Sequence, residues 1–265
     1  MSVKKVLFIN QEIYPYLPAS YMSKTTNQVH KEMQELGMDV RTFMPKFGMI
    51  NERRNQLHEV IRLSGINIEI DNRDHPIIIK VATLQTARMQ VYFLYNEDYF
   101  KKTAKELETI SQPDVNDERC IFFIRGAFET IHKLMWVPEI VHCQGWVSAF
   151  APLYLRYYYK GHPTLGNVKV VFSLFKDKFE GALDERLPEK LKLDNVPDEV
   201  LAGIKQFDYI SLCKLAIDYS DGVIEAEEGV DSELVEYAKA SGKKFLPYPG
   251  EEKFVQTYKE FYESL

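Results

Sequence analysis

The segment whose residue types and position could do chemistry is residues 10–22, which read Asn-Gln-Glu-Ile-Tyr-Pro-Tyr-Leu-Pro-Ala-Ser-Tyr-Met. It follows the apolar run Val6-Leu7-Phe8-Ile9, which is typical of a parallel strand buried on both faces. In open parallel sheets the loop after such a strand lies at the carboxyl edge, where ligands are held, and the next helix offers its N-terminal amides to anions. The loop contains no glycine, so no bare backbone is available to approach a phosphate.

Several other polar and aromatic residues have two interpretations each. His142 ends an expected strand at the same edge, so it could face a ligand or be a buried histidine with its hydrogen bonds satisfied. Tyr154 and Tyr158 could stack on a sugar, although the tyrosines at 154 and 157–159 cover all sides of a helix, so some of them must be buried. The charges at 176–178 and 185–192 are typical of solvated surfaces.

The sequence has no signature of a metal or cofactor site. It lacks a His-x-x-x-His motif, a Ser-His-Asp arrangement and a glycine-rich phosphate loop. Cys120, Cys143 and Cys213 are too few and too scattered for a zinc cage, and an odd number of cysteines fits a reducing compartment. We therefore expect no metal, no cofactor and a cytoplasmic location.

The elements that position these residues begin with one βαβ unit between Lys4 and Gly48. The strand at 6–9 is followed by a helix and then by a strand at 40–44. The helix is expected to be capped by Ser23 and stopped by Gly37. Its sheet-facing stripe is expected to consist of Val29, Met33 and Leu36.

The rest of the chain continues this alternation of strands and helices. Strands are expected at 61–70, 77–82, 89–94, 140–142, 168–174, 221–225 and 244–248, and helices at 117–135, 148–159, 204–219, 231–240 and 251–265. The strands at 77–82 and 89–94, joined by a turn at 85–88, are expected to form an antiparallel insertion. Residues 50–58 and 184–199 are interpreted as irregular surface segments. The fold class is therefore α/β, an open, mostly parallel Rossmann-like sheet with helices on both faces, in a single domain over residues 1–265.

Composition excludes some classes of partner. The net charge is −6 with no basic block, which argues against binding to nucleic acid or to an anionic membrane surface. No apolar run approaches the roughly 20 residues that span a bilayer. A hydrophobic content of 45% with 27% charged residues is ordinary for a globular protein that stays in water.

Scattered blocks of the chain resemble the bacterial glycogen and plant starch synthases, which use ADP-glucose. The matching residues include Glu12, Pro15, Gly37, Asp39-Val40-Arg41, Pro45, Gly48, the run from Val91 to Phe100, and Arg119, Phe122, Phe123, Lys214, Ala216, Ile217, Tyr219 and Asp221. The resemblance implies the N-terminal half of a GT-B glycosyltransferase, one of two facing Rossmann-like domains. It makes Glu12, Asn96, His142 and Lys176 candidates for a ligand cleft, although Glu12 and Asn96 could equally cap neighbouring amides.

The first loop departs from the family at the positions that approach the sugar donor. The family reads Glu-Val-Ala-Pro-Phe-Ala-Lys-Thr-Gly-Gly-Leu-Gly-Asp. The lysine of that motif corresponds here to Pro18, the paired glycines to Ser20 and Tyr21, and the aspartate to Lys24. Proline brings neither charge nor amide donor, and a tyrosine would block an approach to phosphate.

Two later motifs also differ from the family. The His-Asp of its Ala-His-Asp-Trp motif corresponds to Gln144-Gly145, and the first histidine of its His-Asn-Leu-Ala-Tyr-Gln-Gly motif corresponds to Phe175. Phenylalanine can pack on a sugar but cannot accept its hydrogen bonds. Transfer also requires fixed cations beside the developing diphosphate charge, and Lys24 and Lys176 do not stand at the matching positions.

We therefore expect a synthase homologue reduced to its N-terminal domain, without catalytic residues of its own. Its expected role is to bind glucan or to dock onto an enzyme of glycogen metabolism. A second hypothesis is a split glucosyltransferase whose second domain is on another chain, and a third is a cleft remade for another small ligand. The last helix could be the C-terminal helix that returns to this domain in such enzymes, or a simple edge helix.

Overall fold

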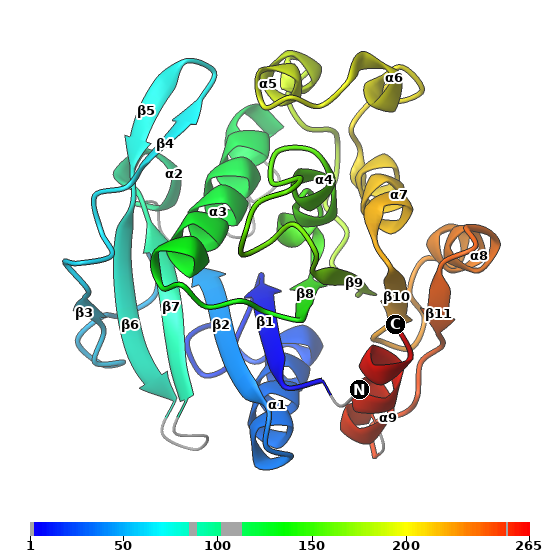
Figure 1. Cartoon of the computed structure of the whole chain (residues 1–265), viewed down its shortest axis with the longest axis horizontal. Helices are drawn as coiled ribbons and strands as arrows, with labels where there is room; N and C mark the ends of the chain where they lie inside the picture. Colours follow the sequence, from blue (N-terminus) through cyan, green and yellow to red (C-terminus); the bar gives the residue numbers. More distant parts are fainter. Residues whose placement is uncertain (1–2, 85–88, 102–112, 253) are drawn as a thin grey trace.

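The computed structural model describes residues 3–84, 89–101, 113–252 and 254–265 (Figure 1). Within these residues the main sheet has nine strands in the order β11-β10-β9-β8-β1-β2-β7-β6-β3. The strands are β1 (Lys5–Asn10), β2 (Asp39–Pro45), β3 (His58–Glu59), β6 (Ile78–Leu84), β7 (Met89–Tyr95), β8 (Ile140–Gln144), β9 (Lys169–Leu174), β10 (Gly222–Glu225) and β11 (Lys244–Leu246). Those from β11 to β7 are parallel, whereas β6 and β3 pair antiparallel. The expected fold class is confirmed. The strands expected at 77–82 and 89–94 do pair antiparallel, but β7 also pairs parallel with β2, so it belongs to the parallel sheet and is not part of an insertion.

The helices lie on both faces of the sheet (Figure 1). α3, α4 and α7 cover one face, while α1 and α9 contact each other on the opposite face. Their bounds are α1 (Tyr21–Glu35), α2 (Glu97–Phe100), α3 (Pro113–Lys133), α4 (Ala151–Arg156), α5 (Leu187–Leu193), α6 (Asp198–Leu201), α7 (Tyr209–Tyr219), α8 (Ser232–Ala240) and α9 (Phe254–Ser264). No helix of the described segments is long and apolar enough to cross a membrane.

The first βαβ unit forms as expected, but its helix begins earlier than the sequence suggested. Ser20, not Ser23, is the N-cap: its Oγ accepts a hydrogen bond from the Ser23 amide at 2.9 Å, and the Ser23 Oγ accepts one from the Ser20 amide at 2.9 Å. This reciprocal pair is a capping box, in which Ser23 fills the third helical position. Gly37 ends the helix with φ of +84°, as expected, whereas Leu36 is 44% exposed and does not face the sheet.

Several expected bounds need correction because local turns override the hydrophobic pattern. Of residues 61–70, only β4 (Asn67–Ile70) is a strand, and it pairs with β5 (Arg73–Pro76) in a separate hairpin that the sequence did not predict. The helix expected at 148–159 is shorter, because a 3-10 turn, η2 (Trp146–Ser148), precedes α4. α7 begins only at Tyr209, because Asp208 caps it through the Ser211 amide at 2.8 Å. The turn expected at 85–88 lies outside the described residues.

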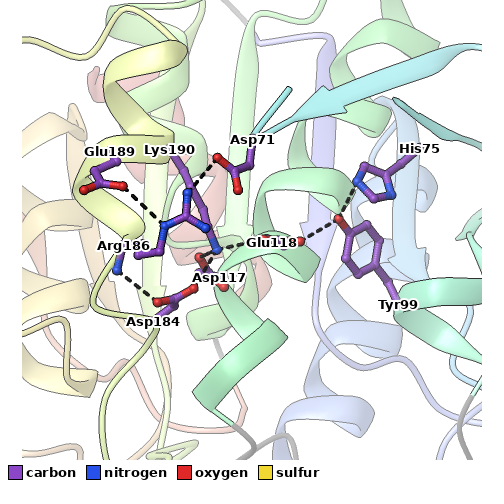
Figure 2. A network of polar contacts seen from close by, with 9 residues as sticks. All are labelled: Asp71, His75, Tyr99, Asp117, Glu118, Asp184, Arg186, Glu189 and Lys190. Carbon is purple, nitrogen blue, oxygen red and sulfur yellow. Dashed lines mark hydrogen bonds and ion pairs between the residues drawn. The ribbon is translucent and has the colours of Figure 1, made fainter. Parts of the chain in front are cut away.

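The segment 184–199 is not irregular, and its charges are not all solvated. It contains α5 and the start of α6. The side chain of Lys190, on α5, is 1% exposed, with its Nζ 2.7 Å from Asp117 Oδ2, 2.7 Å from Glu118 Oε1 and 2.8 Å from Asp184 Oδ2. Figure 2 shows these contacts and those of Glu118 with Tyr99. Burial opposes the charge, but the hydrogen bonds to these carboxylates outweigh it and raise the pKa of Lys190 above its ordinary value.

A second buried network ties α5 to α3. Asp194, which follows α5, lies 2.9 Å from the Nη1 of Arg125 on α3 and accepts a 2.5 Å hydrogen bond from the Tyr154 hydroxyl. Arg125 also donates to the Tyr158 hydroxyl at 2.8 Å. Because Lys190 and Asp194 are four residues apart, both networks lie on one face of the helix.

α9 packs on the sheet through aromatic residues. The Tyr262 hydroxyl lies 2.6 Å from His142 Nδ1, and the Ser173 hydroxyl lies 2.6 Å from His142 Nε2. A Cβ at Gly222 would come within 2.7 Å of the Phe261 ring, so glycine allows the helix to approach β10. Burial lowers the pKa of His142 to about 3, so this histidine is neutral in the folded chain at neutral pH.

The Lys190 network predicts a large loss of stability when the cation is removed. In Lys190→Met, three carboxylates lose the cation that they share, and the side chain of one of them, Asp117, is fully buried. We expect the free energy of unfolding to fall by about 3–5 kcal/mol, measured by urea denaturation at pH 7. Lys192→Met is the matched control: Lys192 is 48% exposed and pairs with Asp198 at the surface, so its loss should cost less than about 1 kcal/mol. Equal stability of the two variants would contradict this interpretation.

His142 predicts a pH dependence of stability. Its pKa is about 3 in the folded chain and 6.5 in the reference state, so the stability it contributes is complete above pH 6.5 and is lost as pH falls toward 3. His142→Gln should be less stable than wild type at pH 7.5, and the difference in unfolding free energy should narrow by up to about 1.4 kcal/mol per pH unit below 6.5. His58→Gln is the control, because His58 is exposed. The unfolding free energy of this variant should vary with pH as that of the wild type does. If the difference in unfolding free energy between wild type and His142→Gln stayed constant from pH 7.5 to 4, the protonation of His142 would not be the cause of the pH dependence.

Candidate functional site

A cavity of about 740 Å³ opens at the carboxyl edge of the sheet. Three groups of residues line it: the loop after β1 with the first turn of α1, the loop after β9, and Trp146 at the start of η2. Met49 and Glu227 complete the lining. Because parallel strands end at the same edge, loops far apart in the sequence meet there.

The entrance to α1 is already occupied by a carboxylate of the chain itself. Glu12 Oε2 accepts a 2.5 Å hydrogen bond from the Ser20 hydroxyl, whose oxygen in turn accepts from the Ser23 amide. The N-terminal end of a helix carries partial positive charge, so Glu12 lies where this dipole favours an anion. A phosphate placed here would have to displace or repel Glu12.

The floor of the cavity carries a second carboxylate, Asp177. Its Oδ2 accepts a hydrogen bond from the Trp146 amide at 2.8 Å, and its Oδ1 lies 2.9 Å from the Tyr209 hydroxyl. Burial raises the pKa of Asp177 to about 7, although both hydrogen bonds favour the charged form. The Gln11 Oε1 accepts from the Val147 amide at 3.3 Å beside it.

The lysines that line the cavity already have partners. Lys176 Nζ is 3.2 Å from Glu227 Oε1, and Lys178 Nζ is 3.7 Å from Asp231 Oδ2. Both lysine side chains are about half exposed. With Glu12, Asp177 and Glu180 also on the wall, the lining holds more carboxylates than lysines, which suits hydroxyl donors better than a polyanion.

The structure places some of the predicted site residues at the cavity. Glu12 and Lys176 line it, as do four of the positions that differ from the family: Pro18, Ser20, Tyr21 and Phe175. Gly145 is buried beside it, with φ of +82°. Gln144 is also buried, and neither side-chain polar atom has a partner among the described residues.

Other predicted residues lie elsewhere. Asn96 caps α2 through the Asp98 amide at 2.9 Å and donates to the Pro76 carbonyl at 3.0 Å, which fits its alternative role as a cap. His142 is fully buried under α9 and both of its ring nitrogens have hydrogen-bond partners, so of its two interpretations the buried histidine is confirmed and the ligand-facing one is wrong. Lys24 is exposed on α1 and is not part of the lining.

The predicted sugar-stacking surface is not formed. Tyr154 is fully buried, so it offers no ring face to a sugar and the prediction is wrong for this residue. Tyr158 is partly buried, with Arg125 held over its ring at 4.5 Å. The helix α4, which carries Tyr154, ends at Arg156 and packs against α7, so Tyr158 lies in the turn that follows it.

Sequence reasoning missed Asp177, which it assigned to a solvated face. Its position three residues after the buried strand β9 was the available signal, because that loop lies at the ligand edge. Phe179 was missed in the same way, and its ring packs on Trp146 with centroids 4.7 Å apart. Among the described residues, no group of three or more His, Cys, Asp or Glu side chains could hold a metal ion.

Solved structures and related sequences agree on the fold. The catalytic domain of starch synthase IV from Arabidopsis thaliana, bound to ADP and acarbose, superposes with a TM-score of 0.72 at 18% identity, over 93% of this chain and 51% of that one. The glycogen synthase of Chlorobium phaeobacteroides is 32% identical over 220 residues, 82% of this chain and 44% of that protein. The glycogen synthase of Chlorobium chlorochromatii is 34% identical over 218 residues, 81% of this chain and 44% of that protein.

The chain thus spans less than half the length of the curated relatives it matches. The family model described as the starch synthase catalytic domain matches residues 5–245, which include every strand of the main sheet except the last residue of β11. The resemblance drawn from single motifs is therefore confirmed over most of the sequence, and this chain belongs to the starch synthase catalytic domain family.

Proposed function

We propose that this domain binds the end of an α-glucan in the carboxyl-edge cavity and does not transfer glucose by itself. The observation that carries the proposal is the charge of the lining: Glu12 occupies the N-terminal end of α1, and both lysines are paired with carboxylates. A diphosphate requires fixed, available cations. A neutral polyhydroxyl ligand requires hydrogen-bond acceptors, which the cavity has.

The apolar part of the lining supports the same ligand class. Tyr21 contributes a partly exposed ring to a wall that also holds carboxylates, and the buried rings of Trp146, Phe175 and Phe179 support this wall from behind. Sugars present CH faces that pack on such rings, and hydroxyl groups that donate to carboxylates. The solved relative holds acarbose together with ADP, and we propose that this chain retains only the carbohydrate side of such a site.

Differences from the family motifs support a role without catalysis. Pro18 replaces a lysine, Gly145 an aspartate and Phe175 a histidine, and all three positions lie at or beside the cavity. Binding to glucan would place the domain beside the enzymes of glycogen metabolism, where docking onto one of them is a compatible role. The three cysteines are buried and unpaired, which supports a reducing compartment such as the cytoplasm.

One observation favours a second candidate function. The chain spans 44% of each of two glycogen synthases and 51% of the solved starch synthase chain, which is the share expected for one of two facing domains. A separate chain could supply the other domain and its cations. This split glucosyltransferase would need the cavity to lie at the interface of the two chains.

Glucan binding predicts a specific set of affinities. Wild-type protein should be retarded in native gels that contain glycogen, and isothermal titration should detect maltoheptaose but not ADP. Tyr21→Ala removes a ring from the lining and should weaken maltoheptaose binding about tenfold, the equivalent of about 1.4 kcal/mol. Tyr14→Ala is the matched control, because Tyr14 belongs to the same loop but is 43% exposed and does not line the cavity. ADP binding without glucan binding would refute the proposal.

The split enzyme predicts activity only after reconstitution. The purified chain should incorporate no glucose from ADP-glucose into glycogen. Adding the separately expressed C-terminal half of a bacterial glycogen synthase should produce incorporation if the second candidate function is correct. The control is the same C-terminal half alone. Incorporation no greater than that control eliminates the split enzyme and leaves the glucan-binding domain.

A further inference from the structure

The side chain missing at Gly145 leaves a space that two other side chains fill. A Cβ built on Gly145 would lie 2.7 Å from Gln11 Oε1 and 3.1 Å from Asp177 Oδ2. The family carries an aspartate at this position, and a leucine at the position of Asp177. The carboxylate beside Trp146 therefore comes from the loop after β9 in this chain, rather than from the end of β8.

Strand register explains how the two positions meet. β8 and β9 are parallel neighbours, and Gln144, the last residue of β8, pairs with Ser173. The residue after Gln144 and the loop after Leu174 consequently leave the sheet side by side. A second carboxylate at position 145 would fit only if Gln11 or Asp177 moved. Its Cβ would lie 2.7 Å from Gln11 Oε1, which is closer than side-chain packing tolerates.

Asp177 is held in one orientation by donors on both oxygens. The Trp146 amide donates to Oδ2, and the Tyr209 hydroxyl, which also lies 2.9 Å from the Phe175 carbonyl, contacts Oδ1. A hydroxyl has a single proton, so Tyr209 cannot donate to both acceptors at once. Beside an ionised Asp177 the proton goes to Oδ1, because two acceptor oxygens 2.9 Å apart would otherwise repel each other. Each carboxylate oxygen can accept more than one hydrogen bond, so Asp177 keeps acceptor capacity on the side that lines the cavity.

We propose that Asp177 is the specificity-determining acceptor for the hydroxyl groups of the glucan, replacing the aspartate absent at position 145. This inference rests on the proposed function of the cavity. An aspartate fixed by two donors presents its remaining lone pairs without loss of side-chain entropy, which favours a ligand with paired hydroxyls over an apolar ligand of the same shape.

Asp177→Asn tests the inference by removing the charge and one acceptor while keeping the size of the side chain. We expect maltoheptaose to bind at least tenfold more weakly, as measured by isothermal titration at pH 8. Glu185→Gln is the matched control, because Glu185 is exposed and does not line the cavity, and the affinity of this variant should change by less than twofold. A thermal melt of each variant establishes that the protein is folded.

A pH series provides a second readout that does not depend on a variant folding. A hydroxyl donates better to a carboxylate than to a carboxylic acid, so wild-type affinity should rise between pH 6 and pH 8, the range in which Asp177 ionises. The groups facing it are Glu12, from the loop after β1, and Tyr209 and Cys213 on α7, and burial raises the pKa of the last two above this range. Glu12→Gln should therefore keep the rise in affinity, whereas Asp177→Asn should abolish it.

The outcomes separate the inference from the function on which it rests. If the wild type binds no maltoheptaose at any pH, the proposed function fails. If the wild type binds it and Asp177→Asn binds equally well at pH 8 with the same pH profile, the function stands and the role of Asp177 is refuted. A lower melting temperature of Asp177→Asn with unchanged affinity would mean that the residue only holds η2 in place.

Discussion

The carboxylate of Glu12 lies at the N-terminal end of α1, and the proposed ligand class depends on this contact. Helix dipoles and free amides attract anions, and α/β folds commonly leave this position open for phosphate. In this chain Ser20 links the Glu12 carboxylate to the Ser23 amide. A carboxylate of the chain itself therefore occupies the position that favours an anion. The interaction of such a carboxylate with the helix dipole typically contributes about 0.3–1 kcal/mol. A nucleotide diphosphate would meet a negative charge where other folds offer a positive one.

The remainder of the cavity follows from the order of the strands. The loops after β1 and β9 meet beside η2 because β8 lies between β1 and β9 in the sheet. Gly145 provides the room for Asp177, while the Trp146 amide and the Tyr209 hydroxyl set its orientation. A buried carboxylate without partners would be strongly unfavourable. The Trp146 amide and the Tyr209 hydroxyl favour the charged form of Asp177, but burial still raises its pKa to about 7.

Stability away from the cavity depends on buried ion pairs rather than on apolar packing alone. Lys190 on α5 contacts Asp117 and Glu118 on α3, and Asp194, the C-cap of α5, contacts Arg125 on α3. Such pairs contribute little net stability compared with apolar residues, but the loss of one partner is costly. Their effect here is to fix the position of α5 on α3. The segment that follows β9 is thereby attached at both ends, by the sheet and by α5, and Asp177 lies within it.

The sequence by itself determined the alternation of strands and helices, the α/β class and the family. Apolar runs such as Val6–Ile9 and helix-ending residues such as Gly37 are local signals that act over a few residues. The sequence also indicated the loop after β1 as part of the site, but only the tertiary structure decided which charged side chains are buried and which partners they have. A charge run containing Asp177 or Lys190 is indistinguishable from a solvated face until the partners of each charge are known, and those partners lie 31 and 73 residues away. The burial of Tyr154 and His142 was likewise decided by α5 and α9. Desolvation depends on neighbours brought together by folding, which the local sequence does not encode.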